Sequence, residues 1–226
     1  MARTLEDLVQ RQFRSWEQNR RSRGAEAPRP CVALSRLPAA GAAELGRRLA
    51  ERLGYAFFGI EIVDRIARET GLRHELVAGV DEHVRRSIDR YVVDAFRRER
   101  FTESDYLRHV VATVASLGER GAAVILGRGS PFILPPERAL RVLVTAPREA
   151  RLERVAKQEN LSPAAADARL AALDAERREF LLHHFRRDPD AFEHYDLGLN
   201  LGTLSMEVAL DLTEAALRAR FGVARP

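Results

Sequence analysis

The chain has 226 residues, of which 46% are hydrophobic and 31% charged, and this balance excludes disordered, fibrous and collagen-like proteins. Because domains of roughly 150 residues are common, the length allows one large domain or two small ones. The single cysteine, Cys31, excludes an intramolecular disulfide, and no stretch has the roughly 18 apolar residues of a membrane-spanning helix. We therefore expect a cytoplasmic protein with no membrane partner.

The charges nearly cancel. The 37 Lys and Arg residues oppose 33 Asp and Glu residues, which leaves a net charge of +4. Most of this excess lies in residues 1–30, so the remainder of the chain is close to neutral. Because proteins that coat nucleic acid carry a strongly basic face, we do not expect nucleic acid as a partner.

Residues 1–22 are expected to form an amphipathic helical arm, followed by a linker at 23–30 that contains one glycine and two prolines. Four apolar residues of the arm fall on one helical face: Leu5, Val9, Phe13 and Trp16. Such a stripe favours packing on the protein's own core or on a second subunit. Contact with another protein or an acidic surface is the alternative.

From Cys31 onward, short apolar runs alternate with helical patterns. Strands are expected at residues 31–35, 55–58, 122–126, 140–146 and 196–201. Helices are expected at residues 42–53, 61–70, 74–100, 103–119, 148–158, 162–185 and 205–220. The second helix is expected to end at Gly71, and Thr102 with Asp105 is typical of a capping box that opens the fourth.

Apolar strands separated by helices indicate an α/β fold in which helices cover both faces of a parallel sheet, giving three layers, α/β/α. Ligands of such sheets bind at the carboxyl ends of the strands. The segments expected along that edge are 35–36, 58–59, 127–129, 146–147 and 201–202. We therefore look for functional residues there.

The first of these segments leads into a loop of small residues and then a helix, which is the geometry of a phosphate-binding turn. The loop lacks the lysine and the Ser or Thr of the G-x-x-x-x-G-K-[ST] motif, because the only lysine is Lys157. Taken alone, the loop favours an ordinary turn, since small-residue turns are common.

Several motifs together resemble the cytidylate kinase-like family, P-loop nucleoside monophosphate kinases related to (d)CMP kinase. The motifs span residues 31–217: S-R-L-P-A-A-G-A-A-E-L (35–45), L-A-E-R-L-G-Y-A-F-F (49–58), G-R-G (127–129), F-I-L-P-P-E-R-A-L-R-V-L-V-T-A-P (132–147), L-D-A-E-R-R-E-F (173–180) and H-Y-D-L-G-L-N-L-G-T-L-S (194–205). The resemblance implies a P-loop NTPase fold with a five-stranded parallel sheet at 31–226. It also implies an acceptor-binding helical region at about 60–120 and a lid at about 160–190.

The resemblance further implies phosphoryl transfer from ATP, with Mg²⁺, to CMP, dCMP or a similar monophosphate. Its expected catalytic residues are Arg128, which would clamp the acceptor phosphate, and the lid residues Asp174, Arg177 and Arg178. Its expected nucleotide-binding residues are Ser35, Arg36, Ala39, Ala40, Gly41, Ala42, Ala43, Glu44, Arg108, Gly127, Gly129 and Asn200. Of these, Arg108 would be a second acceptor-phosphate contact, Asn200 would lie near the donor base, and Glu44 is the candidate Mg²⁺ ligand.

The chain also departs from the family pattern. Alanines stand at 39, 42 and 43 where the family has Gly, Gly and Arg, and Gly59 stands where relatives carry Asp. Each added Cβ restricts the turn, and the loss of Arg at 43 removes a donor-side cation. Two functions therefore stay open: a working nucleotide kinase, and a catalytically impaired pseudokinase that acts by binding nucleotides or proteins.

Overall fold

The computed structural model describes residues 29–77, 82–97 and 104–223. The predicted arm at 1–22 and most of the linker lie outside the described residues. Among the described helices, none combines the length and the apolar composition that crossing a membrane requires.

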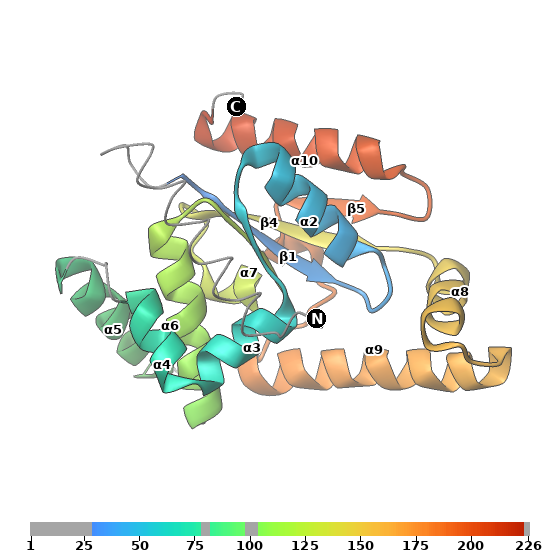
Figure 1. Cartoon of the computed structure of the whole chain (residues 1–226), viewed down its shortest axis with the longest axis horizontal. Coiled ribbons are helices and arrows are strands. Elements are labelled where there is room, and N and C mark those ends of the chain that lie inside the picture. Colours follow the sequence, from blue (N-terminus) through green and yellow to red (C-terminus); the bar gives the residue numbers. More distant parts are fainter. Residues whose placement is uncertain (1–28, 78–81, 98–103, 224–226) are drawn as a thin grey trace, which may run out of the picture.

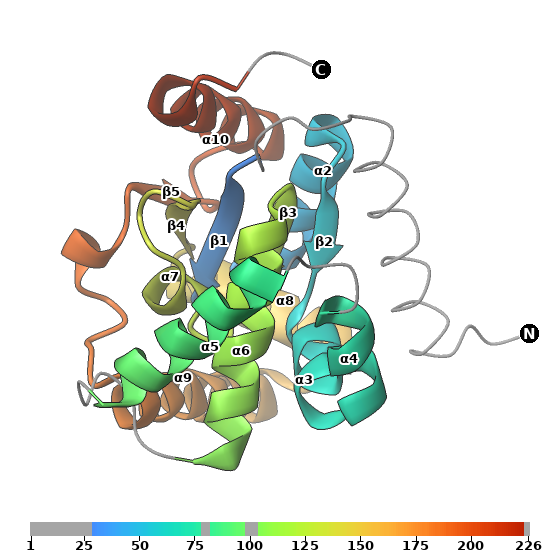
Figure 2. The same ribbon diagram turned by 90° about the vertical axis from the view of Figure 1, so that its left-hand side faces the viewer.

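The centre of the fold is one five-stranded sheet with the order β2-β3-β1-β4-β5, and all four strand pairs are parallel. Figure 2 shows the five strands side by side in this order. The strands are β1 (Cys31–Arg36), β2 (Ala56–Phe58), β3 (Ala123–Leu126), β4 (Ala139–Thr145) and β5 (Leu197–Asn200). The predicted five-stranded parallel sheet is therefore confirmed.

Helices cover both faces of this sheet, which gives the predicted three layers (Figure 1). One face packs against α2 (Ala42–Leu53) and α10 (Met206–Phe221). The other face packs against α3 (Ile60–Arg68), α4 (Thr70–Val77), α6 (Asp105–Arg120), α7 (Ser130–Ile133) and the end of α9 (Pro163–Phe185). Two further helices, α5 (Glu82–Arg97) and α8 (Arg148–Glu159), pack on α6 and α9, respectively.

The apolar runs of the strands have a direct structural cause. Along β1, Cys31 and Ala33 belong to the core under α6, whereas Val32 and Leu34 belong to the core under α2, and all four are fully buried. Because side chains alternate between the two faces and both faces are covered, no position of the strand can be polar without a partner.

Two local predictions are wrong. The second helix does not end at Gly71: α3 ends at Arg68, and α4 starts at Thr70 and runs through the glycine. The N-cap of α6 is Ser104, whose Oγ accepts a hydrogen bond from the Leu107 N–H at 3.1 Å, so it performs the role predicted for Thr102. Thr102 itself lies outside the described residues. The short helices α7 and η1 (Phe192–His194) had no periodic pattern and were not predicted.

Candidate functional site

Two adjoining cavities open along the carboxyl edge of the sheet. The larger, of about 590 Å³, lies over the start of α2, and the smaller, of about 210 Å³, lies between β1, the 127–129 turn and α9. Arg36 and Ile60 line both cavities. The edge that the sequence singled out therefore does carry open sites.

The larger cavity borders the uncapped start of α2. Gly41 is the N-cap, with φ 93°, and no side chain caps the first-turn N–H groups. An uncapped helix N-terminus facing a cavity favours an anion, because both the free N–H groups and the helix dipole attract negative charge. Predicted residues 39–44 all line this cavity, although the Ala40 and Ala42 side chains are themselves buried in the core.

Arg154 of α8 holds this turn from the outside. Its Nη1 donates to the Ala39 carbonyl at 3.0 Å and its Nη2 donates to the Leu201 carbonyl at 3.2 Å. A Cβ at Gly41 would lie 3.2 Å from Leu201 Cδ1, so the turn has little room for a side chain. Ala39 takes the left-handed φ of 57°, a strained conformation for a residue with a Cβ. The turn thus keeps a tight conformation, with left-handed φ at Ala39 and Gly41, despite its alanines.

Arg128 lies at the wall of the smaller cavity, at the turn after β3. Its Nε and Nη2 form a two-pronged ion pair with Asp64 of α3, at 2.6 and 2.5 Å, and the Phe180 ring covers its guanidinium at 5.0 Å. Arg128 thus has a structural partner as well as a place at the cavity wall. Held on one edge and one face, the guanidinium is fixed in orientation.

Tyr106 of α6 completes this network, because its hydroxyl donates to Asp64 Oδ1 at 2.8 Å. Burial and this hydrogen bond raise the pKa of the Tyr106 phenol to about 12, so the tyrosine stays a donor at neutral pH. Gly129 allows the close packing behind the turn, since a Cβ there would lie 2.1 Å from Phe185 Cζ.

Of the three predicted lid residues on α9, only Arg177 lines one of the two cavities. Arg177 is buried and its Nη1 donates to Asp190 at 2.9 Å, while its Nη2 lies 3.4 Å from Ser35 Oγ and 3.2 Å from the Pro189 carbonyl. Its Nε is buried and has no hydrogen-bond partner among the residues that the structure describes. Asp174 pairs with Arg151 of α8 at 2.7 Å and lines neither cavity.

Three other predicted residues also lie apart from the two cavities. Arg178 is exposed and pairs with Asp188 and Asp190 at 3.3 and 3.2 Å. The Asn200 side chain accepts a hydrogen bond from the Gly202 N–H at 2.9 Å, which closes the turn after β5. The Arg108 guanidinium lies over the Phe96 ring at 5.0 Å. The predicted roles of these residues stay predictions.

Sequence reasoning missed Asp64, Tyr106, Phe180, Arg154 and Glu61. Asp64 is 42 residues from Tyr106 and 64 residues from Arg128 along the chain, so no local pattern connects them. Asp64 is one of four charged residues among the nine of α3, so nothing in the local sequence distinguished it. Glu61 lines the larger cavity together with Glu44.

These two carboxylates bear on the implied Mg²⁺. Magnesium in phosphate-transferring sites is held by one or two carboxylates together with phosphate oxygens and water. Glu44 and Glu61 line one cavity beside an anion-favouring helix end, so the residues present fit such an ion. Across the described ranges, no group of three or more His, Cys, Asp or Glu side chains could hold a metal without a ligand's help.

The comparisons with known proteins decide the family. The model of the cytidylate kinase-like family matches residues 31–203. The chain belongs to this family. The strand order and the turn before α2 accordingly identify a P-loop NTPase fold.

Individual relatives are more distant. A cytidylate kinase of Methanopyrus kandleri is 27% identical over 82% of this chain and 92% of its own length. A uronate isomerase of Corynebacterium glutamicum is 36% identical over 90 residues, so the match covers 39% of this chain and only 17% of that protein. An uncharacterized protein of Eubacterium ventriosum has a similar crystal structure, with a TM-score of 0.59 at 15% identity over 85% of this chain and 100% of the other, which shows the fold alone.

Proposed function

We propose that the protein is a nucleotide kinase that transfers the γ-phosphoryl group of ATP to CMP, dCMP or a similar nucleoside monophosphate. The observation that carries this proposal is the pair of adjoining cavities at the strand ends, one beside an uncapped helix N-terminus and one walled by arginines. Family membership supports the class of reaction.

In this proposal the larger cavity takes the ATP phosphates and the smaller cavity takes the acceptor monophosphate. The first-turn N–H groups of α2 suit the donor phosphates, because they point their dipoles into the larger cavity. Arg128 suits the acceptor phosphate: a guanidinium binds phosphate oxygens in a planar fork, and Asp64 and Phe180 leave Nη1 available. Mg²⁺ bound with Glu44 and Glu61 would neutralise charge on the donor phosphates.

The chemistry needs little covalent help from the protein. A lone pair on an acceptor phosphate oxygen forms a bond to the γ-phosphorus, and the bond from that phosphorus to the β,γ-bridging oxygen breaks. The electron pair leaves with ADP, and no proton has to move when the acceptor phosphate is a dianion. The residues therefore act by positioning the two phosphates and by balancing charge.

The second candidate function is a catalytically impaired pseudokinase. It is favoured by the donor side, where alanines replace the family's Gly, Gly and Arg and no lysine lies in the turn. Such a protein would bind nucleotides without turning them over, or act through a partner or a second subunit at its N-terminal arm. We place either activity in the cytoplasm.

A coupled assay for ADP formation separates the two candidates, with each nucleoside monophosphate tested against ATP·Mg²⁺ and GTP·Mg²⁺. The kinase predicts turnover that depends on the acceptor and is highest with a cytidine monophosphate. In parallel, millimolar ATP·Mg²⁺ should raise the Tm, because a ligand that binds only the folded state stabilises it. Absence of turnover with a raised Tm leaves the nucleotide-binding pseudokinase, and absence of both contradicts nucleotide binding altogether.

A further inference from the structure

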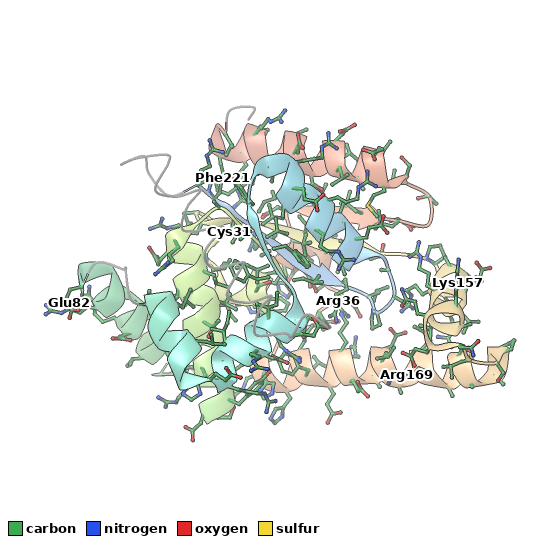
Figure 3. All side chains as sticks on the ribbon, in the orientation of Figure 1. Cys31, Arg36, Glu82, Lys157, Arg169 and Phe221 are labelled. Carbon is green, nitrogen blue, oxygen red and sulfur yellow. The ribbon has the colours of Figure 1, made fainter. Side chains whose placement is uncertain are left out.

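Among the charged residues that the structure describes, Arg36 alone lines both cavities. It is the last residue of β1. Figure 3 shows it between the end of β1 and α9. The strand pairs on both sides, with β3 and with β4, so its end is anchored and the side chain starts from a rigid point.

The other arginines of the site have partners. Arg128 pairs with Asp64, Arg177 pairs with Asp190, and Arg154 donates to two main-chain carbonyls. Arg47, which lines the larger cavity only, lies over the Phe57 ring at 6.0 Å. Arg36, by contrast, has no ion pair and no hydrogen bond to any residue in 29–77, 82–97 or 104–223. A half-buried guanidinium carries five N–H donors, so its position is favourable only when something accepts from them.

The charges around Arg36 increase this demand. Burial, together with the nearby positive charges of Arg177 and Arg128, lowers the pKa of Arg36 to about 10 against the opposing effect of Glu61. Three guanidinium groups therefore lie near one another, and the carboxylates that pair with Arg128 and Arg177 leave Arg36 without an ion pair of its own. Because like charges repel and burial removes water, this arrangement stores an unfavourable free energy that a bound anion would relieve.

We propose that Arg36 contacts the phosphoryl group as it passes between the two cavities, and that it supplies there the positive charge that a lysine supplies in other phosphate-binding turns. This inference rests on the proposed kinase function and assigns one catalytic residue to it. The geometry carries it: the side chain opens on the donor cavity and the acceptor cavity at once, and the turn itself has no cation. In the transition state the charge of the transferred group is spread over its three equatorial oxygens, which lie between the two nucleotides. A cation at that place therefore stabilises the transition state more than either bound nucleotide.

Steady-state kinetics of Arg36→Gln test the role. We expect kcat to fall by about 100-fold, while the KM values for ATP and CMP change by less than about threefold. Arg169→Gln is the matched control, because Arg169 lies on α9, is exposed, pairs with Glu159 and lines neither cavity. A kcat of Arg36→Gln within about threefold of wild type would overturn the proposal.

A second measurement holds even if the wild-type protein does not turn over. ADP, Mg²⁺, CMP and aluminium fluoride together mimic the transferred phosphoryl group between donor and acceptor. Calorimetry with the wild-type protein should show that aluminium fluoride tightens CMP binding by about 100-fold, and Arg36→Gln should lose that gain while binding CMP alone as before. Equal gains in both proteins, or no gain in a wild-type protein that binds ADP and CMP, would contradict the role of Arg36.

The stability of the ligand-free variant provides the folding control. Removing a cation that is crowded by two others should raise the Tm of Arg36→Gln by about 2 °C or more, whereas a merely structural arginine would lower it on removal. A lowered Tm would therefore count against the proposal. If the wild-type protein binds neither ADP nor CMP, the proposed function itself fails, which is a different result from a failure of Arg36 alone.

Discussion

The walls of the two cavities differ in the groups that they offer to an anion. The wall of the smaller cavity contains charged side chains that other side chains hold in place, with Arg128 fixed by Asp64 and Arg177 fixed by Asp190. The larger cavity adds the uncapped main-chain N–H groups at the start of α2 to its charged side chains, and its alanines contribute shape rather than charge. The difference teaches that drift in the donor turn need not remove binding, because main-chain N–H groups remain whatever the side chains are.

The largest expected effect is on ligand affinity at the smaller cavity. Arg128→Ala should lower the affinity for CMP by about 100-fold or more, because a desolvated charge pair with the phosphate is lost. Isothermal titration with CMP measures it, and circular dichroism checks that the variant is folded. An unchanged CMP affinity in a folded variant would show that the smaller cavity does not hold the acceptor phosphate.

Asp64→Asn tests whether the orientation of Arg128 matters. We expect kcat/KM for the acceptor to fall by about 10-fold, because the guanidinium loses its two-pronged carboxylate partner. The pKa of Tyr106 should also fall from about 12, since the negative charge that holds its proton is gone, and ultraviolet titration of the phenol reports this. Retained kcat/KM with a lowered pKa would mean that Asp64 serves the fold and not the site.

Ala43→Arg tests whether the larger cavity lacks a positive charge that turnover requires. Ala43 is exposed at the start of α2 and lines the larger cavity, so an arginine fits without displacing the core. A cation restored beside the donor phosphates should raise kcat by about 10-fold. Ala43→Gln is the neutral control, and equal turnover in the two variants would locate the defect elsewhere.

Ala39→Gly is expected to have the smallest effect. Relief of the left-handed φ of 57° should increase the free energy of unfolding by about 0.5–1 kcal/mol, and urea denaturation measures it. Ala122→Gly is the matched control, because Ala122 has a similar φ of 50° but lines neither cavity. Only Ala39→Gly should alter ATP affinity. An equal change of ATP affinity in both variants would show that the turn at 39–44 does not bind ATP.

Local patterns predicted those parts of the fold that local interactions determine. The helix at 42–53 and the start of the helix at Ser162 follow from apolar spacing and capping residues, and the structure has both. The prediction that a helix ends at Gly71 was wrong because α4 runs through this residue. Gly71 is exposed, and a Cβ built there would have no atom within 4 Å.

The site was harder to predict, because its key contacts join distant segments. Asp64 and Arg128 are 64 residues apart in the chain, and no periodicity connects them. The residues of the turn at 39–44 were found because they are contiguous and follow a strand, whereas Arg154 approaches that turn from α8. The family motif named Asn200, but its side chain closes a turn through Gly202.

The claim that the two cavities form one site is tested most directly by an analogue in which adenosine and cytidine are joined through five phosphates. If donor and acceptor meet beside Arg36, calorimetry should show one molecule bound per chain, about 100-fold more tightly than ATP or CMP alone, because one ligand then fills both cavities. An affinity no greater than that of the better single nucleotide would contradict the account.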